Sequence, residues 1–152
     1  ILIETGDAGQ IASFAHEPPE GRLDALRPEI DAHFSAPSLA AIARSLAASP
    51  TEFAAEALAA LTRAAPLSAA CTIEIIRRLR PEPTLHAALD LEYRFTSRAM
   101  ERADFLEGIR AQIIDKDRTP HWRHAGPDTV TKQDIEDMLT PLGDDALRFS
   151  EG

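Results

Sequence analysis

Charged and aromatic residues concentrate in one stretch of this sequence, DFLEGIRAQIIDKDRTPHW, from Asp104 to Trp122. Near its end, Lys116 and Arg118 alternate with Asp115 and Asp117. Lysine and arginine bind phosphate and carboxylate groups, so both cations are candidate ligands for a small anion, with the aspartates orienting them. The alternative is a solvated helix end, where the two cations only complement the negative pole of the helix.

The carboxylates that open this stretch have a structural interpretation. Asp104 stands at the N-cap of a helix and Glu107 stands three residues later, at N3. Carboxylates at these positions accept hydrogen bonds from free backbone amides and balance the positive helix end. We therefore expect a capping box here and not a general acid and base, and we assign no catalytic residue to this chain.

Two further groups could do chemistry. His121 and His124, with Asp117, are metal-ligand types, but their spacing is loose and no cysteine joins them, so we expect no metal site. Glu92 falls inside an apolar stripe, where a carboxylate has a raised pKa and can act as a base. No nucleophile, oxyanion donor or metal partner stands nearby, and we favour ion pairing of Glu92 and Arg98 with neighbouring helices.

The elements that carry these residues are helices, so we predict an all-α fold. Apolar residues recur at three- and four-residue steps, the breaks between helices are short, and no alternating β-branched run occurs. We expect residues 1–21 to be irregular, with a short extended start at Ile1–Ile3, and residues 22–152 to form one helical domain. That domain holds about six or seven helices, near 23–34, 38–46, 49–65, 68–80, 84–102, 104–114 and 131–139.

Start signals support several of these helices. Ser38 and Thr131 are N-cap residues placed directly before apolar patterns, and the fifth helix begins at Thr84. In SPTE we assign Ser49 as the N-cap, with Pro50 at N1 and Glu52 at N3.

The fifth and sixth helices have unusual patterns. The fifth is apolar on two sides, with Leu85, Leu89, Tyr93, Thr96 and Met100 on one face and Leu91, Phe95 and Ala99 on another. A helix of this kind lies between two layers or is covered by a partner.

In the sixth helix we expect a buried row of Phe105, Ile109, Gln112 and Ile113. Gly108 in mid-helix costs roughly 1 kcal/mol relative to alanine, which suggests that another backbone or a ligand passes close to it. We expect Trp122 to pack back on this helix.

The amino-acid composition limits the classes of partner that this chain can bind. Lys plus Arg is 16 and Asp plus Glu is 25, a formal charge of −9, which disfavours nucleic acid and anionic membranes. The single cysteine, Cys71, lies among small apolar residues and should be buried. One cysteine and no secretion signal suggest a bacterial-type cytoplasm or another reducing compartment, without secretion. Because the chain begins at Ile1 and not at Met, we interpret it as a piece of a longer polypeptide.

The same residues carry a family resemblance. The stretch from Asp104 to Trp122 resembles the C-terminal signature of the 3-hydroxyisobutyryl-CoA hydrolase branch of the enoyl-CoA hydratase/isomerase (crotonase) superfamily. Five further segments extend the likeness across residues 30–149: IDAHFSAPSLAAI, SPTEFA, LDLEYRFTSRAM, VTKQDIEDMLTPLG and ALRF. The resemblance implies that this chain is the C-terminal helical region of a crotonase-fold α/β parent.

In such a parent, the resemblance places the oxyanion hole and the catalytic acidic groups in an N-terminal half. The C-terminal helices complete the acyl-CoA pocket and carry self-association. The implied partners are therefore that catalytic half, acyl-CoA as a substrate and further copies of the chain, without a permanently bound cofactor.

In wider hydratase relatives, an E-G-x-x-A helix followed by a proline and an aromatic residue lies beside the adenine and phosphates of CoA. Glu107, Gly108 and Ala111 match its first part, and Pro120 and Trp122 match its last part. The intervening segment is longer here, so the lysine of those relatives corresponds to Lys116 only with a shift. The resemblance implies a CoA contact by Lys116 or Arg118.

Three functions follow as hypotheses. The leading one is the C-terminal part of a 3-hydroxyisobutyryl-CoA hydrolase-like thioester hydrolase of valine catabolism, supplying pocket wall and association surface. The second keeps the fold but gives the parent enoyl-CoA hydratase or isomerase chemistry. The third is an independent helical interaction module.

Overall fold

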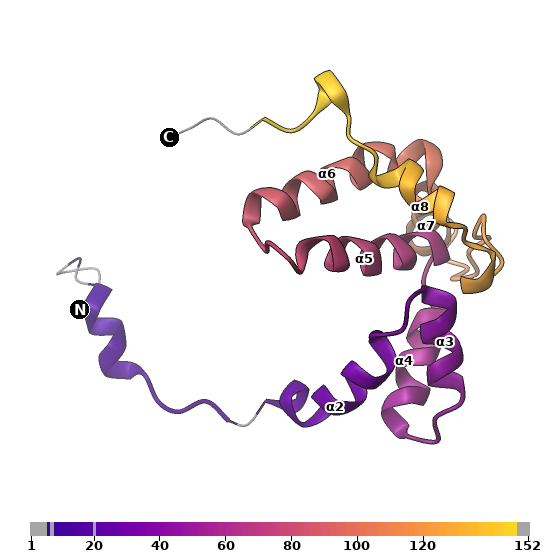
Figure 1. Ribbon diagram of the computed structural model, residues 1–152. Coiled ribbons are helices and arrows are strands. Elements are labelled where there is room, and N and C mark those ends of the chain that lie inside the picture. Colours follow the sequence, from indigo (N-terminus) through magenta and orange to yellow (C-terminus); the bar gives the residue numbers. More distant parts are fainter. Residues whose placement is uncertain (1–5, 7, 20, 149–152) are drawn as a thin grey trace.

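Seven α-helices make up most of the chain that this computed structural model describes, namely residues 6, 8–19 and 21–148 (Figure 1). They are α2 (Arg22–Phe34), α3 (Leu39–Ala47), α4 (Glu52–Arg63), α5 (Pro66–Leu79), α6 (Leu85–Arg102), α7 (Phe105–Ile109) and α8 (Lys132–Leu139). No strand occurs in these described ranges. The all-α prediction is confirmed.

The N-terminal segment contains one short element that the sequence analysis did not anticipate. Residues Ala8–Phe14 form a 3₁₀ helix, η1, which projects away from the other helices (Figure 1). The extended start expected at Ile1–Ile3 lies outside the described residues. The division of the chain into residues 1–21 and 22–152 stays a prediction.

Two small hydrophobic cores organise the helices. Ile42, Leu46 and Ala54 form one core between α3 and α4. The other joins α5, α6 and α8 through a cluster of buried residues: Leu67, Cys71, Ala99, Ala103, Met138 and Leu139. Figure 1 shows α5 and α6 as a long hairpin with α8 beside them, while α3 and α4 form a second hairpin. Neither core is large enough to cover every apolar side chain.

Local capping chemistry decides where most helices begin. The side chains of Ser38, Thr84 and Thr131 each accept a hydrogen bond from the amide three residues later. The predicted caps Ser38 and Thr131 are thereby confirmed. The prediction of Ser49 as a cap is wrong. The cap of α4 is Thr51, whose hydroxyl accepts from the Ala54 amide at 3.2 Å and donates to Glu29 of α2 at 2.6 Å.

One face of α6 is buried and the other is uncovered. Leu91 and Ala99 belong to the interior, whereas Leu85 is 75% exposed and Met100 is 57% exposed. The accessible surface of the chain is 10933 Å², against about 7,600 Å² for a compact monomer of its mass. The projecting N-terminal segment accounts for part of this excess, and the uncovered apolar face adds to it.

The expected ion pairing of Glu92 and Arg98 is also wrong. Glu92 is exposed, and the described residues include no ion pair that involves it. Arg98 donates at 3.1 Å to the Met138 carbonyl, and Arg94 donates at 3.2 Å to the Leu139 carbonyl. Both guanidinium groups therefore satisfy carbonyls at the C-terminal end of α8, where a helix attracts cations.

The helix after α6 changes its winding halfway. Residues Phe105–Ile109 are α-helical, and Arg110–Ile114 form a π-helical turn, η2, in which the Asp115 amide donates to the Arg110 carbonyl at 2.8 Å. The expected buried row is wrong: Phe105, Gln112 and Ile113 are exposed, Ile109 is half-buried, and Ala111 is the buried residue. The wider turn shifts the apolar period relative to an ideal α-helix.

Among the described residues, no single helix is both long and apolar enough to cross a membrane. Helices α4 and α5 reach that length and composition only as a pair, with a bend of 118° between them.

Candidate functional site

The candidate site is the segment in which η2 ends and the chain turns back, residues 110–123. It is anchored by one arginine, Arg110, whose side chain is partly buried. The guanidinium makes a two-pronged contact with Glu107, through Nε at 2.9 Å and Nη2 at 2.8 Å. Its Nη1 also donates to Asp115 at 2.7 Å and to Asp117 at 2.6 Å. One cation therefore holds three carboxylates.

Arg110 also fixes the turn through the backbone. Its Nη2 donates to the Thr119 carbonyl at 3.1 Å, and the Thr119 amide in turn donates to Asp117 Oδ1 at 2.9 Å. These bonds account for all five N–H donors of the guanidinium. The side-chain hydrogen bonds from Arg110 hold the pKa of Glu107 at about 2 and lower the pKa of Asp117, so both carboxylates stay charged near neutral pH.

Lys116 and Arg118 lie between and beside these carboxylates but do not pair with them. Both side chains are exposed, and neither forms a salt bridge within the described part of the chain. The expectation that the two aspartates orient the two cations is wrong, because both aspartates bind Arg110. The structure thus leaves both predicted cations open to solvent.

The backbone at these two cations is unusual. Lys116 and Arg118 both have φ of 55°, in the left-handed region. A residue with a β-carbon pays roughly 1–2 kcal/mol for this conformation. The Arg118 amide donates to the Ala111 carbonyl at 3.0 Å, so the turn is tied to η2 on both sides of Lys116. Strain of this kind persists where surrounding contacts determine the backbone.

The expected capping box at Asp104 and Glu107 is wrong. Asp104 has φ −97° and ψ 19°, outside the extended region of most caps, and its carboxylate makes no bond to the start of α7. Instead, Asp104 Oδ1 accepts from the Arg123 amide at 2.9 Å, and Glu107 Oε1 accepts from the His121 amide at 2.7 Å. Both carboxylates therefore bind backbone amides of the returning chain.

Trp122 completes this fixation. A β-carbon added to Gly108 would lie 3.8 Å from Cη2 of the Trp122 ring. The predicted packing of Trp122 on this helix is confirmed. The close neighbour of Gly108 is therefore an indole ring, whereas we had expected a backbone or a ligand.

The histidines in and directly after this segment have separate roles. His121 contributes its backbone amide to Glu107, and the ring of His124 lies with Nε2 3.4 Å from Asp134 Oδ2. Asp117 is bound to Arg110. In the described ranges, no three His, Cys, Asp or Glu side chains are grouped as metal ligands.

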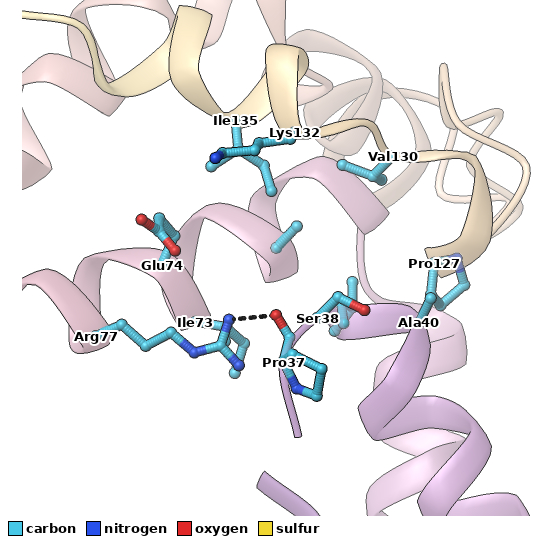
Figure 2. Close-up of a pocket in the computed structure, with 12 residues that line it drawn as sticks. Pro37, Ser38, Ala40, Ile73, Glu74, Arg77, Pro127, Val130, Lys132 and Ile135 are labelled. Carbon is cyan, nitrogen blue, oxygen red and sulfur yellow. Dashed lines mark hydrogen bonds between the residues drawn. The ribbon is translucent and has the colours of Figure 1, made fainter. Parts of the chain in front are cut away.

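Several hollows lie outside this turn among the described residues. The first, of about 410 Å³, lies between α3, α5 and α8, with Glu74, Arg77 and Lys132 on a largely apolar wall (Figure 2). Figure 2 shows Arg77 reaching from α5 to the Pro37 carbonyl, at 2.8 Å, so this guanidinium links α5 to the segment before α3. None of the predicted site residues lines this hollow.

The second hollow, of about 380 Å³, lies between α5 and α6 and is more apolar. Cys71 and Phe95 line it, together with the exposed Glu92 and Ile76. Burial raises the pKa of the Cys71 thiol to about 12, as the prediction of a buried side chain implies. A thiol of this kind is a poor nucleophile.

A family model described as enoyl-CoA hydratase/isomerase matches residues 6–139 of this chain. The chain belongs to the enoyl-CoA hydratase/isomerase family. The resemblance noted in the sequence is thereby confirmed, and the match includes α2 to α8 together with the turn held by Arg110.

Curated relatives of this family member are hydrolases by name. The mitochondrial 3-hydroxyisobutyryl-CoA hydrolase of Mus musculus is 35% identical over 121 residues, which cover 80% of this chain and 31% of the relative. The protein of the same name from Homo sapiens is 33% identical over the same shares of both chains. The chain spans about a third of the length of these relatives.

Solved structures of the family show the same fold. An enoyl-CoA hydratase from Rhodobacter sphaeroides 2.4.1 has 52% sequence identity and a TM-score of 0.89, and the match covers 97% of this chain and 44% of that one. A carnitinyl-CoA dehydratase from Mycobacterium thermoresistibile has 31% identity and a TM-score of 0.87, with 99% and 43% covered.

The sequence alone did not identify Arg110 as a residue of this site. Its spacing from Glu107 is that of a helical ion pair, i to i+3, and this was the only available signal. The contacts with Asp115, Asp117 and Thr119 depend on the chain reversal after η2, which no local pattern indicates.

Proposed function

We propose that this chain is the C-terminal helical part of a 3-hydroxyisobutyryl-CoA hydrolase-like enzyme, which hydrolyses an acyl-CoA thioester with water and releases free CoA and a hydroxy acid. The observation that carries this proposal is the identity of 33–35% to hydrolases of that name, confined to about a third of their length. The catalytic groups then lie on an N-terminal half that is not part of this sequence.

The uncovered apolar surface supports this division of labour. Leu85, Leu89, Tyr93 and Met100 lie exposed on one face of α6, and the apolar hollow between α5 and α6 opens beside Glu92 and Thr96 of the same helix. A preceding catalytic half that packs here would bury these side chains, at roughly 25 cal/mol per Å² of apolar area. The helices then serve as pocket wall and association surface.

The turn held by Arg110 supplies the second part of the proposal. Lys116 and Arg118 are exposed cations without a carboxylate partner among the described residues. We assign them to contacts with the phosphates of CoA. An acidic chain of formal charge −9 repels CoA at long range, so unpaired cations are the groups that can hold its anionic end.

A second candidate function keeps the site and changes the reaction. The enoyl-CoA hydratase from Rhodobacter sphaeroides 2.4.1, at 52% identity, is more similar to this chain than the hydrolases above. This similarity favours hydration of an enoyl-CoA. The residues that decide between the two reactions are on the proposed catalytic half.

The test is an assay of the full-length protein with both substrate classes. Hydrolysis is followed by the appearance of the free CoA thiol from 3-hydroxyisobutyryl-CoA, and hydration by the loss of enoyl absorbance. Thiol release without hydration supports the hydrolase, and the reverse supports the hydratase. If the 152-residue chain alone turns over substrate at the rate of the full-length protein, the division of labour is wrong.

If neither substrate reacts, the chain is better described as a helical interaction module. In the active protein, replacing Lys116 and Arg118 by alanine should raise KM for acyl-CoA with little change in kcat, because the phosphates of CoA are remote from its thioester. An unchanged KM would contradict the proposed CoA contact without affecting the choice of reaction.

A further inference from the structure

The segment from Glu107 to Arg118 has no net charge with which to attract an anion. It contains three carboxylates, on Glu107, Asp115 and Asp117, and three cations, on Arg110, Lys116 and Arg118, so its formal charge is 3 − 3 = 0. In a loosely ordered loop, the neighbouring charges of opposite sign would pair with one another. Affinity for a phosphate group therefore depends on how the charges are arranged.

The arrangement is fixed by Arg110. It binds all three carboxylates of the segment, at 2.6–2.9 Å, and leaves Lys116 and Arg118 without one. The charges are thus separated into a closed cluster around Arg110 and two open cations. The separation is built into the fold because Glu107 is held at the same time by the His121 amide.

The backbone of the turn depends on the same side chain. Lys116 and Arg118 both adopt left-handed φ values, which residues with a β-carbon rarely adopt. Arg110 meets the turn before Lys116 through Asp115, between the two cations through Asp117, and after Arg118 through the Thr119 carbonyl. Each bond restrains a different residue of the turn.

We propose that Arg110 is a positioning residue for CoA binding: it holds the carboxylates of the turn away from Lys116 and Arg118, so that both cations remain available to phosphate. This inference rests on the proposed CoA contact of the two cations. Arg110 itself does not touch the ligand, because its donors are already occupied by Glu107, Asp115, Asp117 and Thr119.

The decisive variant is Asp117→Asn, because charge and positioning predict effects of opposite sign. The substitution removes one negative charge beside the two cations, so simple electrostatics predicts tighter binding of CoA. It also leaves one acceptor oxygen in place of the two that bind Arg110 and the Thr119 amide. One of these bonds is lost and the turn loosens, so the positioning role predicts weaker binding. The dissociation constant of CoA for the full-length protein should rise about threefold, a change of the size that one exposed ionic contact supplies.

Two further variants complete the design. Asp144→Asn removes the same charge from the exposed turn η4 (Gly143–Asp145), away from Arg110, and should leave CoA affinity unchanged or slightly tighter. Arg110→Lys keeps the charge but cannot hold three carboxylates with one planar fork, so it should weaken CoA binding as Asp117→Asn does. Thermal unfolding of each variant verifies that it is folded, and Arg110→Lys decides the question if Asp117→Asn does not fold.

The Lys116→Ala/Arg118→Ala double variant separates this inference from the proposed function. In that background, Asp117→Asn should have no further effect on CoA, because the cations that it positions are absent. Weaker CoA binding by the double variant, together with unchanged or tighter binding by Asp117→Asn, overturns the role of Arg110 alone. CoA binding that the double variant does not change overturns the proposed contact itself.

Discussion

The indole ring of Trp122 lies against Gly108, with its Cη2 atom 3.8 Å from the place where a β-carbon of Gly108 would stand. Two hydrogen bonds flank this contact, from the Arg123 amide to Asp104 and from the His121 amide to Glu107. The chain after η2 therefore reverses direction and packs against α7. This return is what places the Arg110 turn at a fixed position.

Gly108→Ala should be neutral or should stabilise the protein by up to about 1 kcal/mol, because alanine has the higher helix propensity. The new β-carbon would meet the Trp122 ring at 3.8 and 3.9 Å, which is ordinary van der Waals contact. Unfolding in urea measures the change. Gly143→Ala is the matched control: with φ of 63° at Gly143 it should destabilise. A loss of stability in Gly108→Ala would contradict this account of the contact.

Asp104→Ala should lower the free energy of unfolding by about 1–3 kcal/mol, because the Arg123 amide loses its acceptor. Asp104 is 4% exposed, so water cannot easily replace the carboxylate. Asp104→Asn keeps an acceptor oxygen and should cost less. Equal losses in both variants, measured by chemical unfolding, would show that the negative charge of Asp104 matters more than its hydrogen bond.

Acid should weaken the Arg110 cluster. The pKa of Glu107 is lowered from 4.5 to about 2 by hydrogen bonds from Arg110 and from the His121 amide. Because the folded pKa is depressed, this stability is fully present above pH 4.5 and is lost as the pH falls toward 2. Glu107→Gln should flatten the fall of the thermal midpoint over this range, whereas Glu101→Gln, at an exposed residue of α6, should follow the parent curve.

Cys71 tests how well α5 and α6 are packed. With a pKa of about 12 caused by burial, on the order of one thiol in 10⁴ is ionised at pH 8. The native protein should therefore react with a disulfide reagent far more slowly than the urea-unfolded protein. Rapid reaction of the native thiol would mean that the hollow between the two helices opens readily.

Helix positions followed from the sequence wherever one local signal was unambiguous. Ser38 and Thr131 cap their helices as predicted, because each hydroxyl reaches the amide three residues later within its own segment. In SPTE, two hydroxyl residues could serve as the N-cap. Thr51 is the cap, and its hydroxyl also donates to Glu29, a residue 22 positions earlier in the chain. Local sequence carries no information about that contact.

The sequence predicted which residues lie at the candidate site, but it did not predict their hydrogen-bond partners. Lys116 and Arg118 were identified from their types, and the structure places both on one exposed turn. The partners assigned to Asp104, Asp115 and Asp117 were wrong, because each carboxylate binds a group brought close by the chain reversal or by the π-helical turn. Spacing along an ideal helix predicts neither feature.

The uncovered apolar face of α6 leads to a last prediction. It compares one double substitution in the 152-residue chain and in the full-length protein. Leu89→Gln/Met100→Gln changes two exposed apolar side chains. In the 152-residue chain alone, it should alter the free energy of unfolding by no more than about 0.5 kcal/mol, as surface substitutions do. In the full-length protein it should destabilise by about 2–4 kcal/mol in total, if the catalytic half buries both side chains.

The matched control is Ala59→Gln on the exposed side of α4, which should be near neutral in both settings. Thermal or urea unfolding of the parent and both variants, each in the two settings, gives the comparison directly. If Leu89→Gln/Met100→Gln has the same small effect in both settings, the face of α6 does not pack against the rest of the protein. The association surface would then have to be sought on α7 and η2, where Phe105, Leu106 and Ile114 are also exposed.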